Sequence, residues 1–75
     1  MNNTRRKQLR KWLEDIENIK SELESICSDE EEAFDNLPEN MQGSDRGMAF
    51  EEAIDQMNEA VSSIEDAISI IEEIV

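Results

Sequence analysis

The chain has 75 residues, with seven Lys or Arg, twenty Asp or Glu and no His, so its formal charge at pH 7 is −13. A folded chain of this length removes only about 60% of its unfolded surface from water, so its own core gives little net stability. The single cysteine, Cys27, cannot form an intramolecular disulfide, and the absence of His argues against a structural zinc site. Self-association is the remaining way to stabilise the fold.

The hydropathy pattern argues against membrane insertion and secretion. No apolar run approaches the roughly eighteen residues that a membrane span needs, and the start of the chain leads into polar sequence rather than a hydrophobic signal core. We therefore expect a soluble, cytoplasmic protein. With no His to activate it, Cys27 is expected to be a packing residue rather than a nucleophile.

A heptad pattern runs through the first half of the chain and predicts an amphipathic helix over residues 4–36. Thr4 is the expected N-cap, and Pro38 disfavours helical geometry at the residue before it. The pattern continues through Glu30 and Ala33 to Leu37. Its strongest part has spacings of three and four residues and consists of Leu9, Trp12, Ile16, Ile19, Leu23 and Ile26, with Phe34 widening the stripe further on.

The second half repeats a seven-residue unit from Glu51 onward, as EEAIDQM, NEAVSSI, EDAISII and EEIV. It predicts a helix over residues 45–75 with Ser44 as its N-cap. Small residues at one heptad position let another helix approach closely, and three apolar positions per heptad are more than one neighbour can cover. The main stripe is Phe50, Ile54, Met57, Val61, Ile64, Ile68, Ile71 and Val75, and the file beside it is Ala53, Ala60, Ala67 and Ile74.

Residues 37–44 form the expected connector, in which Pro38 begins a short helical turn and Gly43 closes it with a positive φ. Two helices of similar length joined in this way predict an all-α, coiled-coil-like antiparallel hairpin that forms one domain over residues 1–75. If the chain folds back near Asn40, Trp12 should lie against Ile68 and Ile71. In the same register, Ile26 should lie near Ile54, and Phe34 near residues 48–50.

A single hairpin would leave half of the wide apolar stripe exposed, so we expect a homodimer in which two hairpins form a four-helix bundle. The expected oligomer interface consists of Leu9, Trp12, Ile16, Ile19, Leu23, Ile26, Phe34, Phe50, Ala53, Ile54, Met57, Ala60, Val61, Ile64, Ala67, Ile68 and Ile71.

Basic residues are concentrated at the start of the chain, where residues 1–11 carry a charge of +5 and the remainder −18. One interpretation is intramolecular, because the hairpin would place these cations beside the carboxylates and the negative dipole end of the second helix. The other is a site for phosphate or a nucleotide, with Trp12 available for stacking. The candidate phosphate cluster is Arg5, Arg6, Arg10 and Lys11.

Acidic residues dominate the rest of the surface and exclude direct binding to duplex DNA as the main function. Their ordinary interpretation is solubility, because an acidic exterior keeps an apolar bundle from aggregating. The alternative is mimicry of a nucleic-acid backbone, with rows of carboxylates entering the basic groove of a DNA- or RNA-handling protein. The candidate partner surface is Asp29, Glu31, Glu32, Glu51, Glu52, Asp55 and Glu59.

The sequence offers no recognisable set of catalytic or metal-binding residues. The chain has neither His nor Tyr, and the oxygen-bearing residues 35–45 lack the ligand order of an EF-hand loop. A di-iron bundle would need Glu-x-x-His pairs. We therefore expect no enzyme activity, no cofactor and no metal.

Residues 30–47, EEEAFDNLPENMQGSDRG, together with the EEAID-type heptads and the basic opening, resemble a group of small acidic proteins of temperate phages and mobile elements of low-GC Gram-positive bacteria. The resemblance covers nearly the whole chain and is most specific in the DNLPEN segment. It implies a location in the cytoplasm of a bacterial host cell. The group has no established common activity, so no site residues are carried over from it.

Three functional hypotheses remain open. The leading one is a non-enzymatic accessory protein that forms homodimers and binds a host or phage macromolecule, as a stoichiometric inhibitor. The second is an acidic nucleic-acid mimic of the anti-CRISPR or anti-restriction type, which blocks a defence nuclease or DNA-binding protein; this is an analogy of size and charge. The third is sequestration of a phosphorylated nucleotide messenger by the basic cluster.

Overall fold

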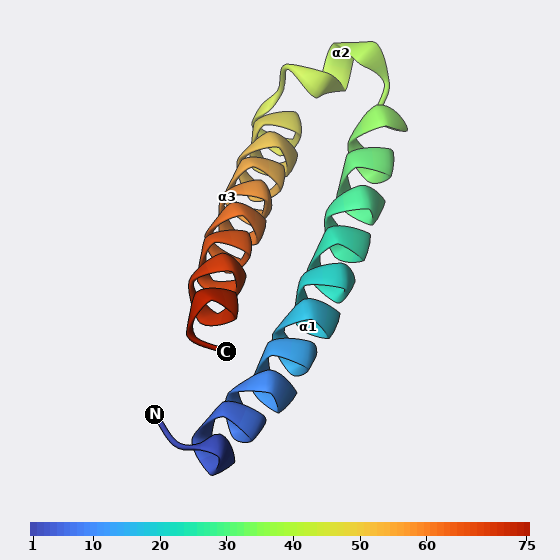
Figure 1. Cartoon of the computed structure of the whole chain (residues 1–75). Coiled ribbons are helices and arrows are strands. Elements are labelled where there is room, and N and C mark those ends of the chain that lie inside the picture. Colours follow the sequence, from blue (N-terminus) through green and yellow to red (C-terminus); the bar gives the residue numbers. More distant parts are fainter.

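A computed structural model describes all 75 residues and contains three helices, α1 (Asn3–Asp35), α2 (Glu39–Gln42) and α3 (Asp45–Ile74). Helices α1 and α3 run antiparallel beside each other, and α2 lies in the connector at one end (Figure 1). The molecule is a rod of 58 × 15 × 12 Å. The predicted all-helical hairpin is thereby confirmed.

The two long helices begin at side-chain caps. Asn2 caps α1, because its side-chain oxygen accepts a hydrogen bond of 2.9 Å from the backbone N–H of Arg5. The prediction of Thr4 as N-cap is wrong, since Asn2 caps as well as a hydroxyl residue does and the helix gains the residues after it. The prediction of Ser44 is confirmed, because its hydroxyl accepts from the N–H of Gly47 at 3.4 Å.

The connector contains the predicted short helical turn, α2, directly after Pro38. Gly43 closes this turn with a φ of −86°, so the predicted positive φ is wrong. The chain keeps right-handed geometry here because the hydroxyl of Ser44 donates back to the carbonyl of Met41. The glycine that the packing requires is Gly47, where an added Cβ would clash with the backbone carbonyl of Gln42.

Three polar contacts between α1 and α3 fix their register, and in each pair the two residue numbers add to 85. They are Arg10 Nη2 to the carbonyl oxygen of Val75 at 3.4 Å, Lys20 Nζ to Glu65 Oε1 at 3.2 Å, and Cys27 Sγ to Asn58 Oδ1 at 3.5 Å. The predicted pairings of Trp12 with Ile68 and of Ile26 with Ile54, which both correspond to 80, are therefore wrong by five residues, or about 7 Å. The predicted position of Phe34 near residues 48–50 is close to the observed register. In this register Asp35, the last residue of α1, is level with Phe50, so α3 begins about 7 Å beyond the end of α1 and the connector with α2 spans this offset.

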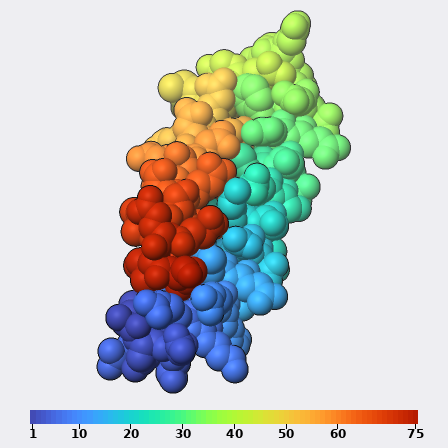
Figure 2. Space-filling model, in the orientation of Figure 1, coloured from blue at the N-terminus to red at the C-terminus, as the bar shows by residue number.

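This register leaves the start of α1 beyond the end of α3. Arg10 is level with Val75, so the six or seven residues before it extend past the C-terminus by about 10 Å. Figures 1 and 2 show this N-terminal segment projecting from the end of the rod.

The seam between the helices uses the predicted stripe of α3 and a different stripe of α1. On α1 the side chains turned toward α3, all buried or half-buried, are Leu9, Leu13, Ile16, Lys20, Leu23, Cys27, Glu30 and Phe34. By contrast Trp12, Ile19 and Ile26 are 51%, 55% and 57% exposed. The predicted packing of Trp12 against Ile68 and Ile71, and of Ile26 near Ile54, is thus not found.

The hairpin has almost no core of its own, because only Cys27, Gly47 and Ile68 are buried among its 75 residues, and no large side chain is fully buried. None of its helices combines the length and the apolar character that crossing a membrane requires.

Candidate functional site

The two flanks of the seam differ in chemistry. Successive helical residues are rotated by about 100°. At every second seam position the next residue therefore projects beside the seam on one flank, and at the alternate seam positions the preceding residue projects beside it on the other flank. Cys27 Sγ contacts both Glu31 and Asn58, which shows that the following residues of both helices share a flank. We call this flank the acidic side; it comprises Glu17, Glu24, Glu31, Glu51, Asn58, Glu65 and Glu72. The opposite flank, the apolar side, comprises Trp12, Ile19, Ile26, Ala33, Ala53, Ala60, Ala67 and Ile74.

The apolar side holds most of the large apolar side chains that the hairpin exposes. Ile74 is 44% exposed, and Ile70, which lies one turn from it and borders this side, is 59% exposed. In the observed register Ile19 lies within one residue of the level of Ala67, and Ile26 within one residue of the level of Ala60, so large residues of α1 lie beside small residues of α3. Together with Trp12 they form one continuous uncovered surface along the rod.

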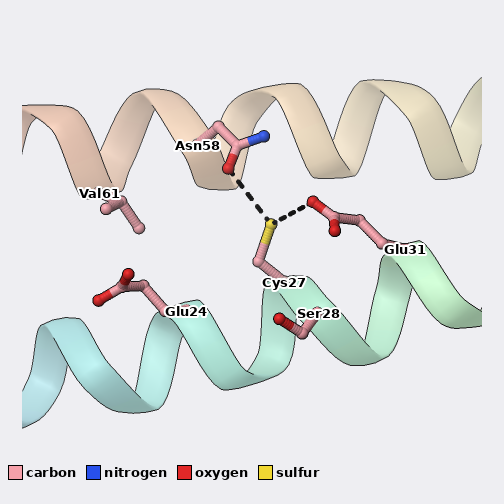
Figure 3. A pocket seen from close by; sticks show the side chains of 6 residues that line it. All are labelled: Glu24, Cys27, Ser28, Glu31, Asn58 and Val61. Carbon is pink, nitrogen blue, oxygen red and sulfur yellow. Dashed lines mark hydrogen bonds between the residues drawn. The ribbon is translucent and has the colours of Figure 1, made fainter.

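The acidic side contains a hollow of about 160 Å³ around Cys27 (Figure 3). The thiol lies 3.7 Å from Glu31 Oε1 and 3.5 Å from Asn58 Oδ1, and its single S–H can donate to either oxygen. Burial raises the pKa of the Cys27 thiol, and the neighbouring carboxylate of Glu31 raises it further. The lining residues are Glu24, Cys27, Ser28, Glu31, Asn58 and Val61.

The chemistry of this hollow is limited. A thiol with a raised pKa stays protonated at neutral pH and is a poor nucleophile. Two carboxylates and no cation line the hollow, so it repels anions. The chain holds no group of three or more His, Cys, Asp or Glu side chains placed to bind a metal ion.

One ion pair joins the two long helices. Lys20 lies in the seam, with its side chain 28% exposed, and reaches Glu65 on the acidic side at 3.2 Å. The other ion pair, Lys11 with Asp15 at 3.7 Å, lies within α1. Sequence reasoning missed Lys20 because a lysine interrupts the apolar pattern of the seam. Its spacing of four residues from Ile16 and three from Leu23 could have identified Lys20 as a seam position.

The basic cluster is not gathered into a site. Arg10 reaches the last carbonyl of α3, as the intramolecular interpretation expects, whereas Arg6 contacts Asn3 at 3.4 Å and Lys11 contacts Asp15. Arg5 and Arg6 lie on the segment that projects past α3, so no ion pair links them to its carboxylates. Arg6 and Arg10 are four residues apart and share a face of α1, but Arg5 and Lys11 lie on other faces. None of the four lines the hollow, which lies about 25 Å farther along α1.

The candidate acidic surface is likewise divided. All seven predicted residues are exposed, but only Glu31 and Glu51 lie on the acidic side. The others, Asp29, Glu32, Glu52, Asp55 and Glu59, lie farther around the two helices. Sequence reasoning left out Glu17, Glu24, Glu65 and Glu72, which recur at seven-residue spacing directly after seam positions.

The residues of the predicted oligomer interface fall into two groups. One group lies in the seam inside the hairpin: Leu9, Ile16, Leu23, Phe34, Phe50, Ile54, Met57, Val61, Ile64, Ile68 and Ile71. The other lies on the apolar side, where a second molecule could reach it: Trp12, Ile19, Ile26, Ala53, Ala60 and Ala67.

Comparisons with family models, with curated proteins and with solved structures found no match to this chain.

Proposed function

We propose that this protein is a non-enzymatic accessory protein of a phage or mobile element that self-associates and binds a macromolecule of its host or phage as a stoichiometric inhibitor. The observation that carries the proposal is the separation of an acidic side and an apolar side on one helical rod. An uncovered apolar side favours contact with another protein surface, while an acidic side favours a basic partner.

The acidic side supports a partner with a basic surface. It carries six carboxylates, of which only Glu65 has a lysine partner. Along α1 the carboxylates of Glu17, Glu24 and Glu31 recur about every 10 Å, because seven helical residues rise by about that distance. A row of carboxylates is attracted to the basic groove of a nucleic-acid-binding protein, so the partner class we favour is a basic nucleic-acid-handling protein, which the row would block as a mimic.

Sequestration of a nucleotide messenger has less support. It needs several cations around one concave site, but the one hollow is lined by carboxylates and none of the cations of residues 5–11 lines it.

Affinity capture from a bacterial host lysate, at about 50 mM and about 500 mM salt, tests the proposal. The probe variant replaces Glu17, Glu24 and Glu31 with Gln. Its matched control removes the same charge elsewhere on α1, by the changes Glu14→Gln, Glu22→Gln and Asp29→Asn. We expect the wild type and the control to retain a basic nucleic-acid-handling protein at low salt and the probe variant to lose it.

A retained protein would then be tested for loss of its nuclease or DNA-binding activity when the hairpin is added in equal amount. Capture of no basic protein, or equal capture by the probe variant and the control, would refute the acidic side as the binding surface.

A further inference from the structure

We propose that the apolar side binds a second copy of this chain in an antiparallel arrangement, with the two connectors at opposite ends and Ile19 of both copies at the two-fold axis. This inference deepens the self-association in the proposed function and rests on it. It specifies the face, the orientation and the residue at the centre of the contact.

The exposed area of the hairpin corresponds to one half of an interface. A folded monomer of 8.6 kDa exposes about 4,700 Å² by the usual scaling with mass. This hairpin exposes 5644 Å². The excess is roughly 900 Å², close to the area of about 800 Å² that each partner contributes to a standard protein interface.

The choice of seam residues also indicates a second contact. Lys20, Cys27 and Glu30 face α3 in the seam, while the more apolar Ile19 and Ile26 remain outside. A hairpin stabilised only by its own packing would turn the more apolar file inward, because burial of apolar surface is the main favourable term. Leaving that file outside is explained if another surface covers it.

Symmetry limits how two apolar sides can meet. A closed dimer buries the same patch on both copies, so the two-fold axis passes through the contact. With the axis at Ile19, the midpoint of the exposed file of α1, Trp12 of one copy lies level with Ile26 of the other. In the same arrangement the two copies of α3 meet at Ala67, where small side chains let the helices approach closely.

Charge selects the antiparallel orientation over the parallel one. The projecting basic segment would lie at the level of the acidic residues 29–35 of the second copy, because residues 3–9 are level with residues 29–35 when Ile19 is at the axis. A parallel dimer would instead place the two copies of this segment, each with Arg5, Arg6 and Lys7, at the same end of the bundle. Between segments on neighbouring helices, opposite charges attract and like charges repel, so the antiparallel dimer is favoured. Both acidic sides then remain on the outside of the bundle.

The first experiment measures mass on the purified chain without any partner. Light scattering at about 100 µM should give twice the chain mass of 8.6 kDa, and a monomer there would overturn the proposal. Ile19→Glu should weaken dimerisation by about 100-fold or more, because two carboxylates would meet at the axis. Asn18→Glu adds the same charge one residue away, on the outer surface, and should leave the mass unchanged.

Circular dichroism accompanies each mass measurement. A monomeric Ile19→Glu chain supports the assigned face whether it stays helical or loses helix, provided that Asn18→Glu remains a helical dimer. A dimer of unchanged affinity in Ile19→Glu would overturn the assigned face.

The second experiment measures orientation with a spin label attached to the thiol that Gly43→Cys introduces, in a Cys27→Ser background. Gly43 has open space around its Cα and an ordinary negative φ, so a labelled side chain fits there. The antiparallel dimer predicts a label separation on the order of 50 Å, from helix rise alone. A separation under about 25 Å would show adjacent connectors and overturn the antiparallel arrangement.

These tests separate the dimer from the acidic-side function. The dimer tests use only purified chain, with the interface substitution on the apolar side and the label on the connector. The capture test uses substitutions on the acidic side, which should leave the mass unchanged. Each proposal can therefore fail while the other stands.

Discussion

Lys20 of α1 and Glu65 of α3 form the one ion pair between the long helices, with 3.2 Å between Nζ and Oε1. Lys20 stands at a seam position level with Ile64, between apolar layers. Partly burying a charge has a desolvation cost that a single exposed partner does not fully offset. We therefore expect this pair to lower the stability of the hairpin relative to an apolar residue at position 20.

Replacing this lysine with an apolar residue should stabilise the hairpin. We expect Lys20→Leu to raise the free energy of unfolding by about 1 kcal/mol, because Leu adds buried apolar surface in the seam and removes a desolvated charge. Urea denaturation at fixed protein concentration measures the change. Lys11→Leu, which removes the exposed pair with Asp15, should change stability by less than about 0.5 kcal/mol. A less stable Lys20→Leu would show that the ion pair contributes more than packing.

The two glycines of the connector region should respond in opposite ways to alanine. Gly47→Ala places a Cβ against the backbone carbonyl of Gln42 and should cost about 2 kcal/mol or more as α2 separates from α3. Gly43→Ala meets no neighbour and should be neutral or stabilise by about 0.5 kcal/mol, since it restricts the unfolded chain. Thermal unfolding of the two variants side by side tests this, and equal midpoints would contradict the packing at Gly47.

The residue that caps α1 is Asn2 in the structure, whereas the sequence pattern predicted Thr4. Asn2→Ala should lower the stability of the first turn by about 1 kcal/mol, because it removes the acceptor for the N–H of Arg5. Thr4→Ala should be neutral or slightly favourable, since Thr4 lies inside the helix. Hydrogen exchange of the Arg5 amide is the direct readout. Faster exchange in Thr4→Ala than in Asn2→Ala would restore Thr4 as the cap.

Cys27 should be unreactive at neutral pH. Burial and the Glu31 carboxylate raise its pKa above the ordinary value of 9.0, so the folded chain keeps the thiol protonated. In a Cys27→Ser background, Ser25→Cys gives an exposed reference thiol, which iodoacetamide should modify at least about tenfold faster at pH 8. The linkage has a definite sign: the protonated thiol contributes its full stability below pH 9, and that contribution falls as the pH rises above 9. Equal rates of modification would show that Cys27 is accessible.

Trp12, the single tryptophan, reports on the apolar side. It is 51% exposed in one hairpin, and the antiparallel dimer would cover it with Ile26 of the second copy. Acrylamide should therefore quench its fluorescence more strongly on dilution below the dimer dissociation constant, and at every concentration in Ile19→Glu. The wild type is measured over the range of protein concentrations in which light scattering shows the change from monomer to dimer. Quenching that stays constant over this range would place Trp12 outside the contact.

Much of the fold was predictable because it depends on local patterns. The heptads of residues 50–75 predict both the existence of α3 and its seam, and Ser44 as its cap is confirmed. The acidic side was harder to predict from the sequence, because its carboxylates are recognised only once the seam positions are known. Glu24 and Glu31 then come together with Asn58 around Cys27, although Asn58 is far from the other three in the sequence.

The sequence by itself determined that two long helices form, where they are joined, and that they carry more apolar surface than one pairing can bury. It could not determine which stripe of α1 faces α3. The files through Trp12 and through Leu13 both combine with Leu9, Ile16 and Leu23 at spacings of three and four, so periodicity fits both.

Tertiary structure decided between them through the register. The turn α2 and the close contact at Gly47 move the reversal of the chain, so that the pairing differs by five residues from the expected one, and the seam rotates to Leu13, Lys20 and Cys27. The exposed apolar side and the position of the acidic side both follow from that rotation. The physical reason is that helix formation is local, whereas register depends on how the connector packs against both helices.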